Sequence, residues 1–299
     1  MDWNGKGLGM ASRRLLISYA HPDDESFGLG GLIAKYVAEG VDVYLICATN
    51  GECGTVAPEH LNGYQSVAEL RLSELACAAE TLKLKQVFTL GFHDSGMMGS
   101  ETSNNAACLW QADQTEVTRR VVEVIREVQP QVVVTFNRYG GYGHPDHIAI
   151  QRATTLAFSA AGEASYETGQ RPYKPRKLYF SSINTAQIRF GITLMRLRRQ
   201  DPRRLGKNKD IDLVKILDNI EPTHALVDVS AYFDDWDRAN NCHKSQLGGG
   251  GPRLPMFLRK VFAPHQGFTR IFPAPTANRV EEHDLFAGVT ADEQQPVMA

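Results

Sequence analysis

Two short clusters of histidine and aspartate carry most of the chemistry that this sequence can be expected to perform. The first lies in AHPDDE (residues 20–25) and the second in GHPDH (residues 143–147). Each follows an apolar run typical of a buried strand, LLISY (15–19) or VVVTF (132–136). Imidazole nitrogens and carboxylate oxygens bind divalent transition metals, so two such clusters at two strand ends predict one shared metal site.

A hydrolytic metal site commonly uses three protein ligands and leaves one position open for water. His21, Asp24 and His147 supply two imidazoles and one carboxylate, and we predict this set. A turn at a strand end can bring residues i and i+3 together, and Pro22 favours such a turn. On spacing alone the roles of Asp23 and Asp24 can be exchanged. Zinc is the expected ion, although iron(II), cobalt and manganese suit the same ligands.

The side chains beside these ligands are candidates for proton transfer. Successive carboxylates in a turn point in different directions, so with Asp24 on the metal, Asp23 is the predicted general base for the attacking water. His144 could donate to the developing oxyanion or to the leaving amine, with Asp146 holding its tautomer. Tyr142, on a glycine-flanked loop, could also reach the oxyanion.

Simpler explanations exist for each cluster taken alone. A single His-Pro-Asp turn often serves only to start a helix, with the aspartate as its cap. Two such clusters, each closing an apolar strand and each carrying an extra ligand-type residue, favour the metal site. The glycines of GLGG (28–31) resemble part of a dinucleotide loop, but the full pattern needs glycine at Ile33. We expect them to let the first helix pack closely beside the site.

Strand-like runs alternate with helix-period stretches over the first half of the chain. This pattern predicts an α/β fold with a mostly parallel sheet flanked by helices. Strands are expected over 14–19, 41–48, 86–90, 132–136, 178–182 and 225–229. Helices are expected over 29–38, 67–82, 115–128 and 231–246, with a charged, mostly helical insertion over 188–217. Ligands of such sheets bind at the carboxyl ends of strands, where His21, Asp94 and His144 fall.

One domain over residues 1–299 fits the chain better than two. We expect an α/β core over about 13–165 and an irregular C-terminal elaboration over about 166–299. The glycine run over 248–251 is expected to be a loop.

Charge and composition argue against several kinds of partner. The formal net charge of −2 gives no general attraction to nucleic acid or to anionic membranes. Five arginines within 196–204 are expected to form a solvated face. The apolar stretch that ends before His21 is too short for a signal peptide or a membrane span. The five cysteines are scattered and form no C-x-x-C pair, which predicts reduced thiols in a cytoplasmic protein.

The sequence resembles the LmbE or PIG-L family of deacetylases. The resemblance is carried by AHPDDE (20–25) and GGYGHPDH (140–147), and it spans nearly the whole chain. Further matches are TNGE (49–52), RLSE (71–74), LGFHDSGM (90–97) and DLFAG (284–288). It is strongest to the branch that contains the mycothiol-pathway deacetylase and the mycothiol conjugate amidase.

The resemblance implies a Rossmann-like fold and the zinc-dependent removal of acetate from a small N-acetylglucosaminyl compound. It implies zinc on His21, Asp24 and His147, Asp23 as the base, and His144 as the acid or oxyanion stabiliser. Family members range from monomers to hexamers, so a homo-oligomer is expected here.

The resemblance also implies substrate contacts from Arg71, Asp94 and Met97, with Glu52 of the TNGE match beside them. Arg71 could instead form an ordinary i,i+3 ion pair with Glu74 on a helix. His243 could border the pocket or serve only in packing and hydrogen bonding. Close relatives often have arginine at the position of His93, and the stretch 137–139 also departs from the family pattern, which leaves the exact substrate open.

Two other functions remain to be weighed. The same chemistry could act on a larger amide, such as a thiol-sugar conjugate or an N-acyl glycoconjugate. A sugar-binding protein without catalysis is the remaining hypothesis, although every member of the predicted catalytic set is present.

Overall fold

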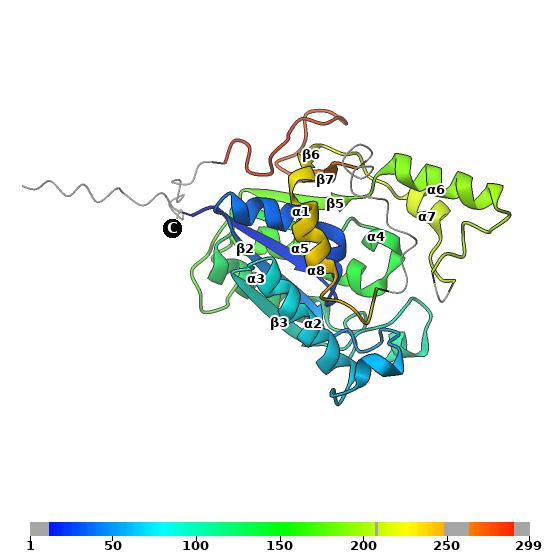
Figure 1. Cartoon of the computed structure of the whole chain (residues 1–299). Helices are drawn as coiled ribbons and strands as arrows, with labels where there is room; N and C mark the ends of the chain where they lie inside the picture. The colour runs from blue at the N-terminus through cyan, green and yellow to red at the C-terminus, as the bar shows by residue number, and fades with distance from the viewer. Residues whose placement is uncertain (1–11, 207–208, 248–262, 290–299) are drawn as a thin grey trace, which may run out of the picture.

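A seven-stranded sheet forms the centre of the protein (Figure 1). The computed structural model describes residues 12–206, 209–247 and 263–289. The strands are β1 (Arg14–Tyr19), β2 (Asp42–Thr49), β3 (Gln86–Phe92), β4 (Val132–Thr135), β5 (Lys177–Ser182), β6 (Ala225–Asp228) and β7 (His265–Phe272). Their order is β3-β2-β1-β4-β5-β7-β6, with β1 to β5 parallel and β7 antiparallel to both β5 and β6.

Helices cover both faces of the sheet. They are α1 (Asp24–Ala38), α2 (Val67–Thr81), α3 (Gln114–Val128), α4 (Gly140–Gly143), α5 (Pro145–Ala160), α6 (Thr185–Leu197), α7 (Leu213–Asp218) and α8 (Phe233–Asn240), with short 3₁₀ turns at Pro58–Leu61, Glu101–Asn104 and Ser230–Tyr232. Strand order runs outward one way from β1 to β3 and the other way from β4 to β5. Right-handed crossovers therefore place α1 and α2 on one face and α3 and α5 on the other.

The adjacency of β1 and β4 determines where the functional residues meet. Leu15 to Ser18 pair in parallel with Val132 to Thr135, although more than a hundred residues separate the two strands. Both strands are almost completely buried, as their continuous apolar sequences predict for the centre of a parallel sheet. Strand order reverses between them, and the crevice at such a switch point is the usual binding position in open α/β sheets.

All six predicted strands are present, with ends that shift by at most two residues. The α/β fold and the mostly parallel sheet are therefore confirmed. Strand β7 was not predicted, because polar side chains interrupt its apolar pattern. Gln266, for example, is buried, accepts a hydrogen bond from Leu32 N (2.7 Å) and donates one to Gly28 O (2.6 Å). The polar side chain of Gln266 thus joins β7 to α1 by hydrogen bonds and does not indicate a loop.

Helix boundaries differ most where the two histidine clusters lie. Helix α1 starts at Asp24, five residues before its predicted start, and α5 was not predicted at all. In both cases a His-Pro-Asp turn starts the helix, directly after β1 for α1 and after α4 for α5, so ligand-type residues lie in the first helical turns. The expected helix over 231–246 is shorter, since α8 ends at Asn240 and turns continue to residue 247.

The second half of the chain completes the sheet instead of standing apart from it. Strands β5, β7 and β6 extend the sheet beyond β4, so the position near residue 165 does not separate a core from an irregular elaboration. Among the described residues of the insertion predicted over 188–217, those of α6 and α7 are helical. The described residues of 185–218 form the arm at the right of Figure 1. The glycine run over 248–251 lies outside the described residues.

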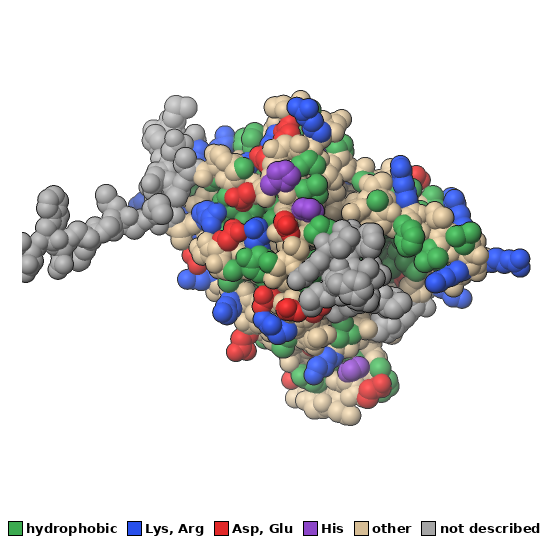
Figure 2. Space-filling view, turned by 45° about the horizontal axis from the view of Figure 1, so that its top comes forward, with side chains coloured by type: hydrophobic (Ala, Val, Ile, Leu, Met, Phe, Trp, Pro, Cys, Tyr) green, Lys and Arg blue, Asp and Glu red, His purple; other side chains and the backbone are tan. Residues whose placement is uncertain are grey.

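The arm has its own small apolar core. Ile192, Leu213 and Ile216 are its buried residues, and Tyr139 and Tyr142 pack against them. The arginines of 196–204 lie exposed at its outer end, and basic side chains are visible along the arm in Figure 2. Among the described residues, none of the helices has both the length and the apolar character needed to cross a bilayer.

Two glycines of α1 permit the close helix packing predicted for them. A Cβ atom at Gly30 would lie 2.5 Å from the Trp236 ring, and one at Gly31 would lie 2.8 Å from it. The indole of Trp236 also donates a hydrogen bond to Ser26 O (2.6 Å). Helix α8 is thereby packed directly against the start of α1, next to the first histidine cluster.

One expectation about the cysteines is wrong. Cys77 of α2 and Cys242, just after α8, form a disulfide with 5.7 Å between their Cα atoms. The bond was not predictable because 165 residues separate the two cysteines and only the packing of α8 beside α2 brings them together. Cys47, Cys53 and Cys108 are free. Because two of the five cysteines are bonded, the cysteines no longer support the predicted cytoplasmic location.

The disulfide should contribute measurably to stability. Reduction, or the variant Cys77→Ser, should lower the free energy of unfolding by about 2–4 kcal/mol, because a long loop is no longer closed in the unfolded chain. Urea denaturation with and without reductant measures this, and Cys53→Ser serves as the free-cysteine control. Thiol titration of the unfolded, unreduced protein should find the three free cysteines. A titration that finds all five would contradict the bond.

Candidate metal centre

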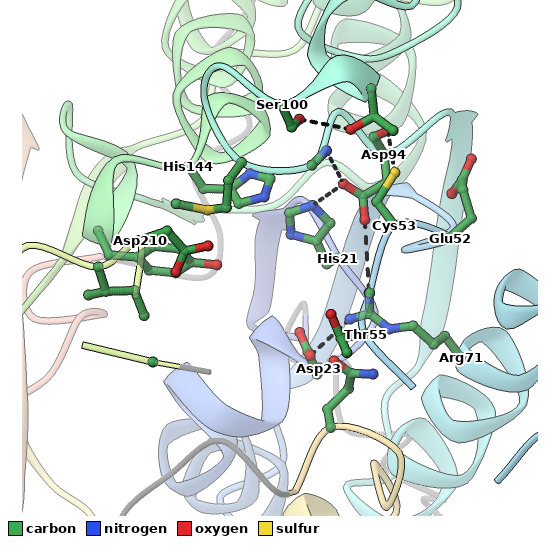
Figure 3. A pocket seen from close by; sticks show the side chains of 18 of the residues that line it. His21, Asp23, Glu52, Cys53, Thr55, Arg71, Asp94, Ser100, His144 and Asp210 are labelled. Atoms are coloured by element: carbon green, nitrogen blue, oxygen red, sulfur yellow. Dashed lines mark hydrogen bonds and ion pairs between the residues drawn. The ribbon is translucent and has the colours of Figure 1, made fainter. Parts of the chain in front are cut away.

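A cavity of about 790 Å³ opens where the carboxyl ends of β1 and β4 meet (Figure 3). It includes eight of the predicted site residues: His21, Asp23, Glu52, Arg71, Asp94, Met97, Tyr142 and His144. The other three, Asp24, Asp146 and His147, contact His21 behind the cavity wall. The sequence-predicted residues are thus brought together from the segments after β1, β2, β3 and β4 and, for Arg71, from α2.

Three residues next to the cavity bring potential metal donors close together. His21 Nδ1 is 3.1 Å from His147 Nε2 and 3.4 Å from Asp24 Oδ2, and His147 Nε2 is 3.4 Å from the other carboxylate oxygen, Asp24 Oδ1. Ligand atoms at about 2.0–2.2 Å from a tetrahedral zinc ion lie roughly 3.3–3.6 Å from one another. His21, Asp24 and His147, called the triangle below, therefore offer two imidazole nitrogens and one carboxylate at separations close to those of a tetrahedral site with one open position.

Hydrogen bonds to the outer ring nitrogens orient both imidazoles toward this triangle. His147 Nδ1 donates to Gly140 O (3.1 Å), and His21 Nε2 donates to Asp146 Oδ2 (3.1 Å). In the neutral rings, the lone pairs of His21 Nδ1 and His147 Nε2 then face each other. Two facing lone pairs beside a carboxylate repel unless a proton or a cation lies between them, so the donor set fits a divalent metal.

The glycine at position 140 is needed for this arrangement. Its φ angle is +66°, and a Cβ atom there would lie 2.9 Å from His147 Cβ. Only glycine lets the backbone carbonyl approach the imidazole this closely. On its other face, the His147 ring stacks on Phe136 at 3.9 Å between ring centres. The strand end and the loop together fix the orientation of the ring.

A second group of potential ligands surrounds the opposite edge of His21. Asp94, His144 and Asp146 lie there with His21 Nε2. These carboxylates already accept protein hydrogen bonds: Asp146 from Ser95 N (2.8 Å) and Ser95 Oγ, and Asp94 from Gly96 N (2.8 Å). Asp24 also accepts a hydrogen bond, from His21 N to Oδ2 (2.7 Å), and His144 lies within reach of the two triangle histidines. The triangle is the predicted site because the lone-pair nitrogens of His21 and His147 face each other there, beside Asp24 Oδ1.

The partner predicted for Asp146 was wrong. Asp146 orients His21, and its carboxylate is 4.0 Å from His144 Nδ1. His144 instead caps α5, and its Nδ1 accepts a hydrogen bond from Asp146 N (3.2 Å). That bond requires a lone pair on Nδ1, so the neutral ring carries its proton on Nε2. The backbone at the start of α5 therefore fixes the tautomer of His144, and the Nε2–H group is a donor available to the cavity.

The electrostatics of the three histidines agree with these assignments. Burial lowers the pKa of His147 to about 4, which keeps the ring neutral. Burial and the neighbouring charges of His21 and His147 lower the pKa of His144 well below its ordinary value. Burial opposes protonation of His21 too, but the carboxylates of Asp94, Asp146 and Asp24 outweigh it and raise its pKa. The surroundings of His21 thus favour a positive charge at the base of the cavity.

Asp23 differs clearly from its neighbour Asp24. It occupies the cap position of α1, yet its side chain makes no capping hydrogen bond, which argues against a purely structural role. Its carboxylate accepts a hydrogen bond from Arg71 Nη2 (2.9 Å) and faces the cavity (Figure 3). Burial raises the pKa of Asp23 to about 6, although Arg71 opposes the rise. It is the carboxylate of the pair that remains available to a substrate.

Arg71 is fixed mainly by protein groups. It donates to Gly51 O (2.8 Å) and Pro22 O (2.6 Å) as well as to Asp23. The alternative ion pair with Glu74 is wrong, because Glu74 accepts hydrogen bonds from Ser245 N (2.8 Å) and Ser245 Oγ (2.7 Å). A sugar contact from Arg71 stays a prediction, and the bonds observed hold Asp23 and the turn before it.

Glu52 and His93 pair with each other at the cavity rim, with 2.6 Å between Oε1 and Nδ1. The departure from the family pattern at position 93 thus lies beside a predicted substrate contact. Met97 also lines the cavity, as does Asp94, which is 3.5 Å from His21 Nε2. Substrate contacts by these residues stay predictions.

Several residues of the cavity wall were missed from the sequence. They are Phe27, Cys53, Gly54, Thr55, Gly96, Ser100, Thr102, Gly206, Asp210, Ile211 and Gln246. Gly206, Asp210 and Ile211 come from the arm, whose position could not be inferred from its composition. Gln246 lies three residues after His243 in the turns after α8, and the signal for it was the family's frequent pairing of histidine and glutamine in a C-terminal helix.

The corrected role of Asp146 leads to a prediction about metal affinity. Asp146→Ala should weaken zinc binding by about 10–100-fold, because His21 loses the acceptor that orients it. His144→Ala should leave the affinity within about threefold, since His144 is not a ligand of the triangle. Chelator competition measures both. Unchanged affinity in Asp146→Ala would contradict its role toward His21.

Removal of a direct ligand should cost more than removal of this supporting residue. His147→Ala leaves two of the three donors of the triangle, so purified protein should contain far less than one zinc ion per chain. Elemental analysis after dialysis measures the content. Undiminished zinc in His147→Ala would remove His147 from the ligand set.

The fold is a Rossmann-like α/β sheet, and a candidate metal centre lies at its switch point. The family model described as PIG-L, GlcNAc-PI de-N-acetylase, matches residues 16–158, which include both histidine clusters. Two deacetylases named for 1D-myo-inositol 2-acetamido-2-deoxy-alpha-D-glucopyranoside are similar over most of the chain. The Thermomonospora curvata protein is 36% identical over 79% of this chain and 81% of its own. The Rhodococcus jostii protein is 35% identical over 94% and 99%. The chain belongs to the PIG-L (LmbE) family of deacetylases.

Solved structures share the fold at lower identity. The N,N'-diacetylchitobiose deacetylase of Pyrococcus horikoshii, complexed with its inhibitor, has a TM-score of 0.59 at 18% identity, covering 89% of this chain and 88% of its own. GalB, the 4-carboxy-2-hydroxymuconate hydratase of Pseudomonas putida KT2440, has a TM-score of 0.58 at 18% identity, covering 89% and 98%. A deacetylase and a hydratase on one fold show that the reaction must be argued from the site.

Proposed function

We propose that the protein is a metal-dependent deacetylase that hydrolyses the acetamido group of a small N-acetylglucosaminyl compound. The observation that carries the proposal is the triangle of His21, Asp24 and His147. The carboxylate of Asp23 lies beside it and makes no capping hydrogen bond to α1. A divalent cation held there, zinc in the first instance, would polarise the amide carbonyl and lower the pKa of a bound water.

The side chains of the cavity supply the proton transfers. Asp23 takes the proton of the attacking water, while its hydrogen bond from Arg71 (2.9 Å) keeps the carboxylate in place. Neutral His144, whose Nδ1 accepts from Asp146 N, donates a hydrogen bond from Nε2–H to the developing oxyanion, and the proton that Asp23 has taken from the water passes to the leaving amine. The hydroxyl of Tyr142, on the loop before His144, is a second candidate for the oxyanion.

The size of the cavity and the relatives support the choice of substrate. A volume of about 790 Å³ is within the range of small-molecule sites and leaves room beyond one sugar ring. The relatives from Thermomonospora and Rhodococcus are named for an N-acetylglucosamine joined to inositol. We therefore propose that compound as the first substrate to test. A cytoplasmic location and a homo-oligomeric state stay predictions.

The arm supports a second candidate, an amidase that acts on a larger amide by the same mechanism. Gly206, Asp210 and Ile211 form a wall of the cavity at the arm. A larger acyl or glycosyl group could contact this wall. Assays for acetate, longer acyl groups and cysteinyl products distinguish the two candidates, and predominant release of acetate would support the first.

Asp23→Asn should separate metal binding from turnover. The variant keeps the three donors of the triangle but loses the base, so kcat should fall by about 10²–10⁴-fold with unchanged zinc content. Acetate release and elemental analysis measure the two effects. Asp210→Asn, a matched change of an exposed carboxylate on the cavity wall, should leave kcat within about threefold.

One outcome would contradict the assignment of the base, and another would contradict catalysis itself. Full activity in Asp23→Asn would remove that residue as the base. A metal-loaded wild-type protein that releases no acyl group from any acetamido sugar or larger amide would support the non-catalytic sugar-binding hypothesis instead.

A further inference from the structure

Glu25 and His243 form a completely buried pair next to the metal centre. Both side chains have an exposed fraction of 0%, and His243 Nε2 lies 2.7 Å from Glu25 Oε1. The residues are 218 positions apart in the chain. A buried carboxylate is costly unless hydrogen bonds compensate for its lost hydration, so the pairing is a strong constraint on both segments. Neither residue lines the cavity.

Glu25 also fixes the backbone of Asp23 through a hydrogen bond. Its second oxygen, Oε2, accepts a hydrogen bond from Asp23 N (3.0 Å). Asp23 has a φ angle of +129°, a conformation that side chains other than glycine rarely adopt and that persists only where the surroundings enforce it. The Glu25 carboxylate holds the backbone nitrogen of Asp23, and Arg71 holds both its carboxylate and Pro22 O just before it.

His243 is itself fixed from the other side. Its neighbour Cys242 is bonded to Cys77 of α2, and Ser245 donates two hydrogen bonds to Glu74 of the same helix. The turns after α8 are therefore anchored to α2 on both sides of His243. The imidazole reaches from this anchored segment to Glu25 at the start of α1.

We propose that His243 is a positioning residue that acts through Glu25 to hold the backbone of Asp23. The geometry of Asp23 then aims its carboxylate into the cavity beside the metal triangle. The proposal rests on the proposed function only in so far as Asp23 is the base. It assigns His243 a task beyond packing, because an apolar side chain of similar size could fill its space but could not donate to Glu25.

Paired variants separate this role from packing. His243→Leu should lower kcat about 10–100-fold, because the base is displaced, with KM and zinc content within about twofold. His243→Gln, whose amide N–H can reach Glu25, should retain kcat within about threefold. Lys244→Ala, a change of an exposed side chain in the same segment, should also keep kcat. If His243→Leu does not fold, His243→Asn replaces it, since the shorter amide cannot reach Glu25.

A double-mutant cycle tests whether the effect runs through Glu25. His243→Leu should change kcat little further, by less than about threefold, in a Glu25→Gln background. Fully multiplicative losses would overturn the proposal, as would an unchanged kcat in His243→Leu or an equal loss in His243→Gln. A rise in KM without a fall in kcat would assign His243 to substrate binding and would also overturn it.

Crystal structures of zinc-loaded wild-type protein and His243→Leu give a readout that needs no substrate. We expect the wild type to keep the positive φ of Asp23 and its bond to Arg71, and the variant to lose both while the three metal donors stay in place. An unchanged Asp23 in the variant would overturn the inference even if the enzyme is an active deacetylase. A displaced Asp23 in a protein that hydrolyses no acetamido sugar would contradict the proposed function and support the positioning role.

Discussion

The facing nitrogens of His21 and His147 are the interaction on which the rest of the structure depends. They lie 3.1 Å apart, and the outer nitrogen of each ring is held by an acceptor, Asp146 or Gly140. The two ring nitrogens and the Asp24 carboxylate therefore converge on one point, where a proton or a cation must lie between the nitrogens. The parallel pairing of β1 with β4 creates this convergence, because each strand delivers its own His-Pro-Asp turn to the same edge of the sheet.

Around this centre, distant parts of the chain hold one catalytic side chain in place. Arg71 from α2 binds the Asp23 carboxylate, and Glu25 binds its backbone nitrogen. His243 binds Glu25 from a segment that the disulfide and Ser245 anchor to α2. The second half of the chain thus completes the sheet through β5 to β7 and supports the catalytic turn as well. The arm adds a wall to the cavity and packs against Tyr142 of the loop that precedes His144.

Local patterns predicted the elements and the metal cluster, whereas contacts between distant residues escaped prediction. The strands β1 and β4 are apolar runs, and a His-Pro-Asp cluster follows each of them, two residues after β1 and nine residues after β4, so the sequence alone predicts that His21 and His147 lie at one edge. The partner of Asp146 could not be inferred, because hydrogen-bond acceptors near it are set by packing to within an ångström or so. The Cys77–Cys242 bond, strand β7 and the His243–Glu25 pair all depend on how the second half folds back on the first.

The most direct test of the metal centre is anomalous diffraction at the zinc edge from crystals of the zinc-loaded protein. The structure predicts one strong peak about 2.0–2.2 Å from His21 Nδ1, His147 Nε2 and an oxygen of Asp24, with Asp23 unbound beside it. A peak bound instead by Asp94, His144 and Asp146, or no ordered peak at the base of the cavity, would contradict the account.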